Sequence, residues 1–333
     1  MKIGILSAAH MHATEYVRAL KSIPGIDYIA VYDHDEGRGT EFAAVHHLEF
    51  QRDMDSVLAA VDAVIVCAEN IFHRQYVERA ARAGKPILCE KPLATTAEDA
   101  ITMVSTCRSY RVPLYMALPA RYLPAVRQLK DVIQRAELGQ IVAINGTNHG
   151  FLPPGWFVDA SLSGGGAVMD HTVHVLDLMR WFLQSEVTEI YAEIDHRIHN
   201  AGIDDSAILT MQFANGVFAT LDPSWSRLDI YPTWGDVTLE IIAAGGIATV
   251  DGFAEYVDVY VPDGKAAHRY SYYGENMNLS LIKDFIDGVD TGHQSALLAT
   301  GVDGVRALEV TLAAYRSAQT HQPVALSPAS FPS

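Results

Sequence analysis

Two stretches near the start of the chain decide the fold: KIGILSAAHMH at residues 2–12 and YIAVYD at residues 28–33. A short apolar run over Lys2–Leu6 is followed by a polar turn, and the residues after it predict a helix over 13–21. The second apolar run ends in Asp33. This order of strand, turn, helix, strand and acid is typical of a βαβ unit that binds a dinucleotide.

The turn departs from the glycine pattern G-x-G-x-x-G of such units, because residues 7–12 read SAAHMH and contain no glycine. Glycines allow a tight turn and a close approach of backbone N–H groups to a pyrophosphate. Ser7 and Ala9 are small enough to keep much of that approach, and Ala13 offers a third small residue if the turn is one residue longer. The cofactor contacts expected here come from Ser7, Ala9, His10, Met11 and His12.

Asp33 stands where the ribose hydroxyls of an adenosine would be bound. A carboxylate repels a 2′-phosphate, so the sequence predicts NAD as the cofactor in preference to NADP. Arg38, five residues downstream, leaves NADP open as the alternative.

Apolar runs and helical patterns go on alternating as far as residue 117, which predicts a doubly wound parallel sheet. The segments are 63–67, 74–83, 86–89, 97–108 and 112–117. Later runs alternate apolar and polar residues, as an antiparallel sheet with one covered face does. These runs are 207–213, 217–221, 237–242 and 257–261. We therefore expect an α/β protein with a Rossmann domain over 1–120 and a second α/β domain over 121–333, built on an open, mainly antiparallel sheet.

Composition limits the classes of partner. The 333 residues carry a formal net charge of −16, which disfavours nucleic acid and anionic membrane surfaces. We expect a cytoplasmic protein, because the N-terminus lacks the apolar core of a signal peptide and no run reaches the roughly 20 apolar residues of a membrane span. The three cysteines, Cys67, Cys89 and Cys107, are interpreted as reduced core residues.

Two longer motifs resemble the Gfo/Idh/MocA family of NAD(P)-dependent oxidoreductases. One comprises DAVIV at 62–66, Asn70, His73 and GKPILCEKPL at 84–93, and the other is GGGAVMDHTVHVLD at 164–177. The resemblance implies a homodimer or homotetramer formed through the C-terminal sheet. It also places Lys91, Asp170 and His174 around the reacting carbon, and Asn70, His73, Glu90 and Lys91 along the cofactor groove.

These residue types suit hydride transfer to or from a hydroxyl-bearing carbon of a small sugar, inositol or related polyol. Oxidation of an alcohol needs a base for the hydroxyl proton and a group that stabilises alkoxide character. His174 suits the base, since imidazole titrates near neutral pH. Asp170 lies one helical turn earlier, beside the imidazole or the substrate hydroxyl, and Lys91 lowers the pKa of the hydroxyl.

Further substrate contacts are expected from the residues that can bind hydroxyls or stack on a sugar ring. They are Tyr122, His149, Trp156 and His171, together with Lys91, Asp170 and His174. The i, i+3 spacing of His171 and His174 also suits a metal site, but no cysteine or tight carboxylate cluster accompanies the pair. Hydrogen bonding to a polyhydroxylated substrate explains both residues, so no metal is expected.

Two other functions remain open. In one, NAD oxidises and re-reduces a sugar transiently so that a glycosidic bond is eliminated. In the other, the protein is a non-catalytic, dinucleotide-responsive regulator on the same scaffold, because a fold does not determine a function. Lys91, Asp170 and His174 argue against the regulator, whereas the missing glycines argue for it.

Overall fold

The computed structural model describes residues 1–260 and 268–327, and the account below is confined to them. Within them the N-terminal part forms a parallel sheet of six strands in the order β3-β2-β1-β4-β5-β6. The strands are β1 (Lys2–Leu6), β2 (Tyr28–Tyr32), β3 (Glu49–Phe50), β4 (Ala63–Val66), β5 (Ile87–Cys89) and β6 (Leu114–Met116). The predicted doubly wound sheet is confirmed. Its topology reverses between β1 and β4, where folds of this kind bind ligands.

Helices alternate with these strands: α1 (His12–Ser22), α2 (Glu36–Val45), α3 (Met54–Ala60), α4 (His73–Arg82) and α5 (Ala97–Ser109). The helices expected over 13–21, 74–83 and 97–108 are present within one residue at each end. The stretch from α2 to α3 had no predicted structure. Its helices begin with an Asp cap, since Asp35 and Asp53 accept hydrogen bonds from the amides of Arg38 and Ser56.

The C-terminal part forms a second sheet, whose described strands follow the order β12-β11-β7-β10-β9-β8-β15. They are β7 (Ile141–His149), β8 (Val187–Asp195), β9 (Ser206–Phe213), β10 (Phe218–Ser224), β11 (Thr238–Ala243), β12 (Gly246–Asp251) and β15 (Val324–Ala325). Only the β7–β10 pair is parallel among these, so the expected open, mainly antiparallel sheet is confirmed. Along β9 every second residue is buried, the pattern that a sheet with one covered face requires.

A hairpin of β13 (Tyr256–Tyr260) and β14 (His268–Tyr272) stands outside both sheets. The run expected over 257–261 falls on β13, except that its last residue, Val261, lies outside the described residues.

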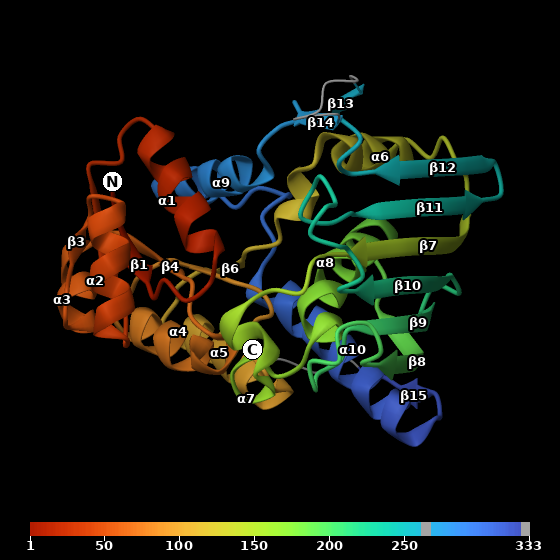
Figure 1. The fold of residues 1–333 in the computed structure, drawn as a ribbon, viewed down its shortest axis with the longest axis horizontal. Helices are drawn as coiled ribbons and strands as arrows, with labels where there is room; N and C mark the ends of the chain where they lie inside the picture. The colour runs from red at the N-terminus through yellow and green to blue at the C-terminus, as the bar shows by residue number, and fades with distance from the viewer. Residues whose placement is uncertain (261–267, 328–333) are drawn as a thin grey trace.

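The remaining helices are α6 (Pro124–Gln134), α7 (Ala160–Ser163), α8 (Ala167–Leu183), α9 (Met277–Thr291) and α10 (Gly301–Thr320), with 3-10 turns η1 (Asn70–Phe72), η2 (Pro119–Tyr122) and η3 (Gly155–Val158). Helices α8 and α10 pack on the second sheet. Figure 1 shows the two sheets at opposite ends of the molecule, with α8 and α10 beside the second one. Helix α9 returns to pack on α1, and α10 also contacts α5 and β6. The boundary between two domains that the sequence places near residue 120 stays a prediction. The 3-10 turn η2 lies at that position.

No helix in the described ranges is both long and apolar enough to cross a membrane.

Candidate active site

The turn after β1 keeps a glycine-like backbone without a glycine. Ser7 has φ +69°, in the left-handed region that glycine favours. Its hydroxyl donates to Asp33 Oδ2 at 3.1 Å and accepts the amide of Ala9 at 3.2 Å. These bonds hold a serine in a conformation that is unfavourable for most side chains, and they tie the turn to the end of β2.

Asp33 is buried and already holds a cation. Arg38 donates from Nη2 to Oδ1 at 2.7 Å and from Nε to Oδ2 at 2.8 Å, and it also donates to Glu69 at 2.8 Å. Burial by itself would raise the pKa of Asp33, but the hydrogen bonds from Arg38 and from the amide of Ala8 lower it. Asp33, the residue expected to bind the ribose hydroxyls, is therefore ionised, and both of its carboxylate oxygens accept hydrogen bonds from Arg38.

Unpartnered polar atoms lie just beyond the carboxyl end of β4. Glu69 Oε2 and Asn70 Oδ1 are buried and have no hydrogen-bond partner among the described residues. Asn70 Nδ2 donates to the carbonyl of Ser163 at 2.8 Å, which links this segment to α7. A dinucleotide, with its ribose hydroxyls and carboxamide, can satisfy such atoms, so the residues present fit an NAD site.

His73, expected in the cofactor groove, is fully buried against backbone carbonyls instead. Its Nδ1 lies 3.0 Å from the carbonyl of Pro92 and its Nε2 lies 3.1 Å from that of Ala68. The ring therefore supports the loop that follows β5 and carries Lys91.

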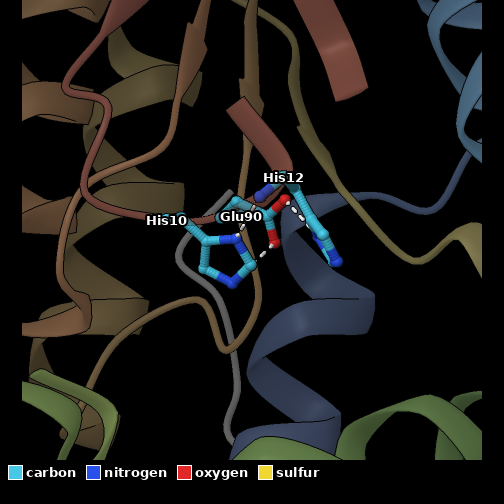
Figure 2. A group of neighbouring side chains, drawn as sticks. All are labelled: His10, His12 and Glu90. Atoms are coloured by element: carbon cyan, nitrogen blue, oxygen red, sulfur yellow. Dashed lines mark hydrogen bonds and ion pairs between the residues drawn. The ribbon is translucent and has the colours of Figure 1, made fainter. Parts of the chain in front are cut away.

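His10 and His12 converge with Glu90 from two parts of the chain (Figure 2). His12 Nδ1 lies 2.9 Å from Glu90 Oε1 and His10 Nε2 lies 3.7 Å from Glu90 Oε2, while the hydroxyl of Tyr16 also donates to Oε1. Burial lowers the pKa of His10 to about 3, so its imidazole is neutral.

Helix α8 is positioned by its glycine-rich start. The carboxylate of Asp204 accepts the amides of Gly166 at 2.8 Å and Val168 at 2.9 Å, which satisfies the first turn. A Cβ on Gly166 would lie 2.0 Å from the carbonyl oxygen of Asp204, so only glycine fits there. Farther along, Asp177 accepts two bonds from Arg121 on η2, both 2.7 Å long. The start and the middle of the helix are thus held.

This placement brings Asp170 to Lys91. The ammonium of Lys91 donates to Asp170 Oδ1, and the indole of Trp225 donates to Oδ2 at 3.2 Å. Burial would raise the pKa of Asp170, but the charge of Lys91 outweighs it and holds that pKa well below its ordinary value. The carboxylate is therefore hydrogen-bonded to Lys91 and Trp225, and it is near enough to His174 to act on the pKa of that imidazole.

His174 lies on the same face of α8 and lines a cavity of about 350 Å³. Other lining residues are His12, Asn148, Trp234, Phe253 and Met277. Burial, and then the positive charge of Lys91, lower the pKa of His174 well below 6.5. A neutral imidazole at the wall of a cavity can accept a proton from a bound hydroxyl.

His171 is fully buried and stacks on Trp234, with ring centroids 5.0 Å apart. Its two ring nitrogens have no hydrogen-bond partner among the described residues, and the Oδ1 atom of Asn148 has none either. Burial lowers the pKa of His171 to about 4. Asn148 lines the cavity of His174, and so does Trp234, on which His171 stacks.

Three other residues expected at the substrate are engaged elsewhere. Tyr122 donates its hydroxyl to Asp284 on α9 at 2.6 Å, and Trp156 donates its indole N–H to the carbonyl of Ala9 at 3.0 Å, on the cofactor turn. His149 pairs with two aspartates: its Nδ1 lies 2.6 Å from Asp236 Oδ2, and its Nε2 lies 3.1 Å from Asp222 Oδ2. The geometry therefore does not support the predicted contacts of Tyr122, Trp156 and His149 with a substrate.

Trp225 and Trp234 are tryptophans that the sequence offers for stacking on a sugar ring, but Trp156 was preferred to them, and Asn148 was not found from the sequence at all. None of them belongs to a spaced motif, and each reaches the site through strands or loops of the second sheet. In the described part of the chain, His10, His12 and Glu90 form a group of three residues that could hold a metal ion. The sequence suggested only the His171–His174 pair as possible ligands, and no metal was expected there.

Comparison with known proteins covers both halves of the chain. The Gfo/Idh/MocA model described as an oxidoreductase family with an NAD-binding Rossmann fold matches residues 1–118, and that of the family's C-terminal domain matches residues 126–249.

Individual relatives extend over nearly the full length. The chain is 27% identical to a myo-inositol 2-dehydrogenase of Thermotoga maritima over 98% of each chain, and 28% identical to a 1,5-anhydro-D-fructose reductase of Ensifer adhaerens over 88% of this chain and 86% of that one. The crystal structure of a probable dehydrogenase from Thermotoga maritima superposes with a TM-score of 0.83 at 26% identity, covering 98% of both chains.

Proposed function

Because this chain belongs to the Gfo/Idh/MocA family of oxidoreductases, we propose that it transfers a hydride between NAD(P) and a hydroxyl-bearing carbon of a sugar, inositol or related polyol. The observation that carries the proposal is the ion pair between Lys91, which lies just after β5, and Asp170 on α8, one helical turn before His174, which lines a cavity. An inositol dehydrogenase and an anhydrofructose reductase among the relatives support this substrate class.

The cofactor site that we propose runs along the carboxyl ends of β1, β2, β4 and β5. Ser7 and Asp33 would hold the adenosine side, and Glu69 and Asn70 offer unpartnered acceptors farther along. When bound, the nicotinamide supplies or takes up the hydride. The site lies where a cofactor-binding unit of residues 1–120 and a substrate-binding unit of residues 121–333 are proposed to meet.

In the proposed chemistry, His174 takes the hydroxyl proton while hydride leaves the same carbon. Its lowered pKa keeps the imidazole neutral and ready to accept at pH 7. Lys91 donates a hydrogen bond to the reacting oxygen, where its charge stabilises alkoxide character. Asp170 and Trp225 position the ammonium, because the carboxylate is itself held from its other side.

The substrate's remaining hydroxyls would bind the unpartnered nitrogens of His171 and the Oδ1 of Asn148. A polyol offers both donors and acceptors, so it can pair with atoms of either kind.

A panel of inositols, aldoses and sugar lactones tests the proposal with NAD and with NADP, read by absorbance of the reduced nicotinamide. Turnover of at least one class is expected. Failure of both dinucleotides to bind in a calorimetric titration would remove the dehydrogenase function altogether.

We also propose self-association through the second sheet. Its uncovered face carries exposed apolar side chains on four strands: Val142, Ile208, Phe218 and Ile247. Apolar residues gathered on an open sheet face are typical of a contact between subunits. Light scattering on the wild type and on a Phe218→Glu variant tests this: a dimer or tetramer that the variant dissociates is expected, and a monomeric wild type would refute it.

A further inference from the structure

We propose that His10, His12 and Glu90 form a binding site for one divalent transition-metal ion, of which zinc is the best match. Two imidazoles and one carboxylate are a ligand set that zinc uses, with a fourth position left for water or another oxygen. The site lies beside the Lys91–Asp170 pair and is distinct from it.

The three side chains already converge. One possible ligand atom from each of His10, His12 and Glu90 lies within 4.8 Å of the other two. Figure 2 shows the two imidazoles on either side of the carboxylate. An ion between them needs only small rotations of the side chains, because metal–ligand distances of about 2.1 Å place neighbouring ligands somewhat over 3 Å apart.

The strongest sign of a missing partner is on His10. Its imidazole is 2% exposed, and its Nε2 has no hydrogen-bond partner among the described residues. The nearest carboxylate oxygen, Glu90 Oε2, is 3.7 Å away, too far for a hydrogen bond. A buried ring nitrogen without a partner costs free energy, and a metal ion would remove that cost.

Ligation through Nε2 requires the ring proton of His10 to sit on Nδ1. A proton on Nδ1 would point at the backbone N–H of His12, so the hydrogen bond of 3.2 Å that this N–H now donates to Nδ1 would be lost. That contact is at the long end of the range for hydrogen bonds, so its loss is small beside the gain of a metal bond.

Charge and outer contacts also favour a cation. Glu90 supplies a buried carboxylate, held in place by the hydroxyl of Tyr16 and by the amide of Lys91 at 3.1 Å. Such hydrogen bonds orient a ligating carboxylate. The positive charge of Lys91 is offset by its bond to Asp170. His12 also lines the cavity of His174, so the open coordination position would face that cavity.

The test is a calorimetric titration of zinc chloride into untagged protein that has been stripped with a chelator and dialysed, with no dinucleotide or substrate present. We expect one equivalent to bind, and we expect His12→Gln to weaken binding at least about 100-fold. Zinc-edge anomalous scattering from crystals should place the ion between the three side chains.

His34→Gln is the matched control, because His34 lies 3.6 Å from Asp33 and 3.9 Å from Glu69 but belongs to no three-ligand group in the described ranges. It should bind zinc as the wild type does. Absence of saturable binding, or equal binding by the wild type and His12→Gln, would overturn the proposal. His12 is partly exposed, so its variant should fold even if Glu90→Gln does not. The result is independent of hydride transfer, since no turnover is measured.

Discussion

The ammonium of Lys91 and the carboxylate of Asp170 form a buried ion pair between residues 79 positions apart in the chain. One partner follows the last residue of β5 and the other lies in the first turn of α8. Neither charge could be buried alone without a large penalty, so the pair requires both halves of the molecule to be in place. The proposed reacting centre is therefore assembled only when the two sheets and their helices pack together.

Replacing His174 tests the proposed base. His174→Ala should lower turnover by roughly 100-fold or more and leave NAD binding intact, because general acid–base groups contribute about 10²–10⁴-fold. Stopped-flow or steady-state rates on the substrate found by the panel, with calorimetric NAD affinities alongside, measure both effects. Full activity in the variant would eliminate His174 as the base.

His171 should act on substrate binding and not on the chemical step. In His171→Ala we expect KM to rise several-fold with kcat changed little, since the lost contact exists in both the ground state and the transition state. A fall in kcat as large as that of His174→Ala would contradict this assignment.

Asp33 should control the choice between NAD and NADP through Arg38. Asp33→Ser removes the carboxylate that repels a 2′-phosphate and frees the guanidinium now bound to it. The ratio of the Kd values for NADP and NAD should fall about tenfold or more. In Asp33→Ser/Arg38→Ala the gain for NADP should be lost. A wild type that already prefers NADP would refute the idea.

His149 should make stability depend on pH in the alkaline range. Burial opposes its charge, but Asp222 and Asp236 outweigh burial and raise its pKa to about 9, above the unfolded value of about 6.5. The protonated form is thus favoured by folding, so its stabilisation is complete below pH 6.5 and is lost as the pH rises through 9.

Urea unfolding of the wild type and His149→Gln across pH 6–9.5 measures this effect. The difference in free energy of unfolding between the two proteins should shrink as the pH rises. A difference that stays constant over this window would show that His149 is not protonated in the folded protein.

The buried pair of Arg121 and Asp177 should stabilise the junction between η2 and α8. Asp177→Asn leaves the guanidinium without its bidentate partner, and breaking such a pair typically costs about 3 kcal/mol. Asp303, 3.6 Å from Arg121, should recover part of that loss. Glu15→Gln, which breaks an exposed pair with Arg18, should change the free energy of unfolding by less than about 1 kcal/mol.

Much of the fold follows from local pattern. The strand at residues 2–6, the acid at the end of β2 and the alternation along β9 all reflect a periodicity set by neighbours in the chain. The helix over Glu36–Val45 was missed because glycines and polar residues blur its apolar face, and its stability depends on packing. Lys91, Asp170 and His174 were recognisable because each stands in a motif with a definite spacing.

The sequence by itself determined the two kinds of sheet, the order of the elements and the residues proposed to carry the chemistry, because hydrophobic periodicity and short motifs are local properties. Only the tertiary structure decided which partner each of these residues has. In the folded protein Asp170 pairs with Lys91 and Trp225, and Tyr122 donates a hydrogen bond to Asp284. His149 pairs with two aspartates, and Glu90 pairs with His10 and His12. Such pairings join residues far apart in the chain, and the free energy that selects them comes from packing and from the cost of burying a charge or polar group without a partner.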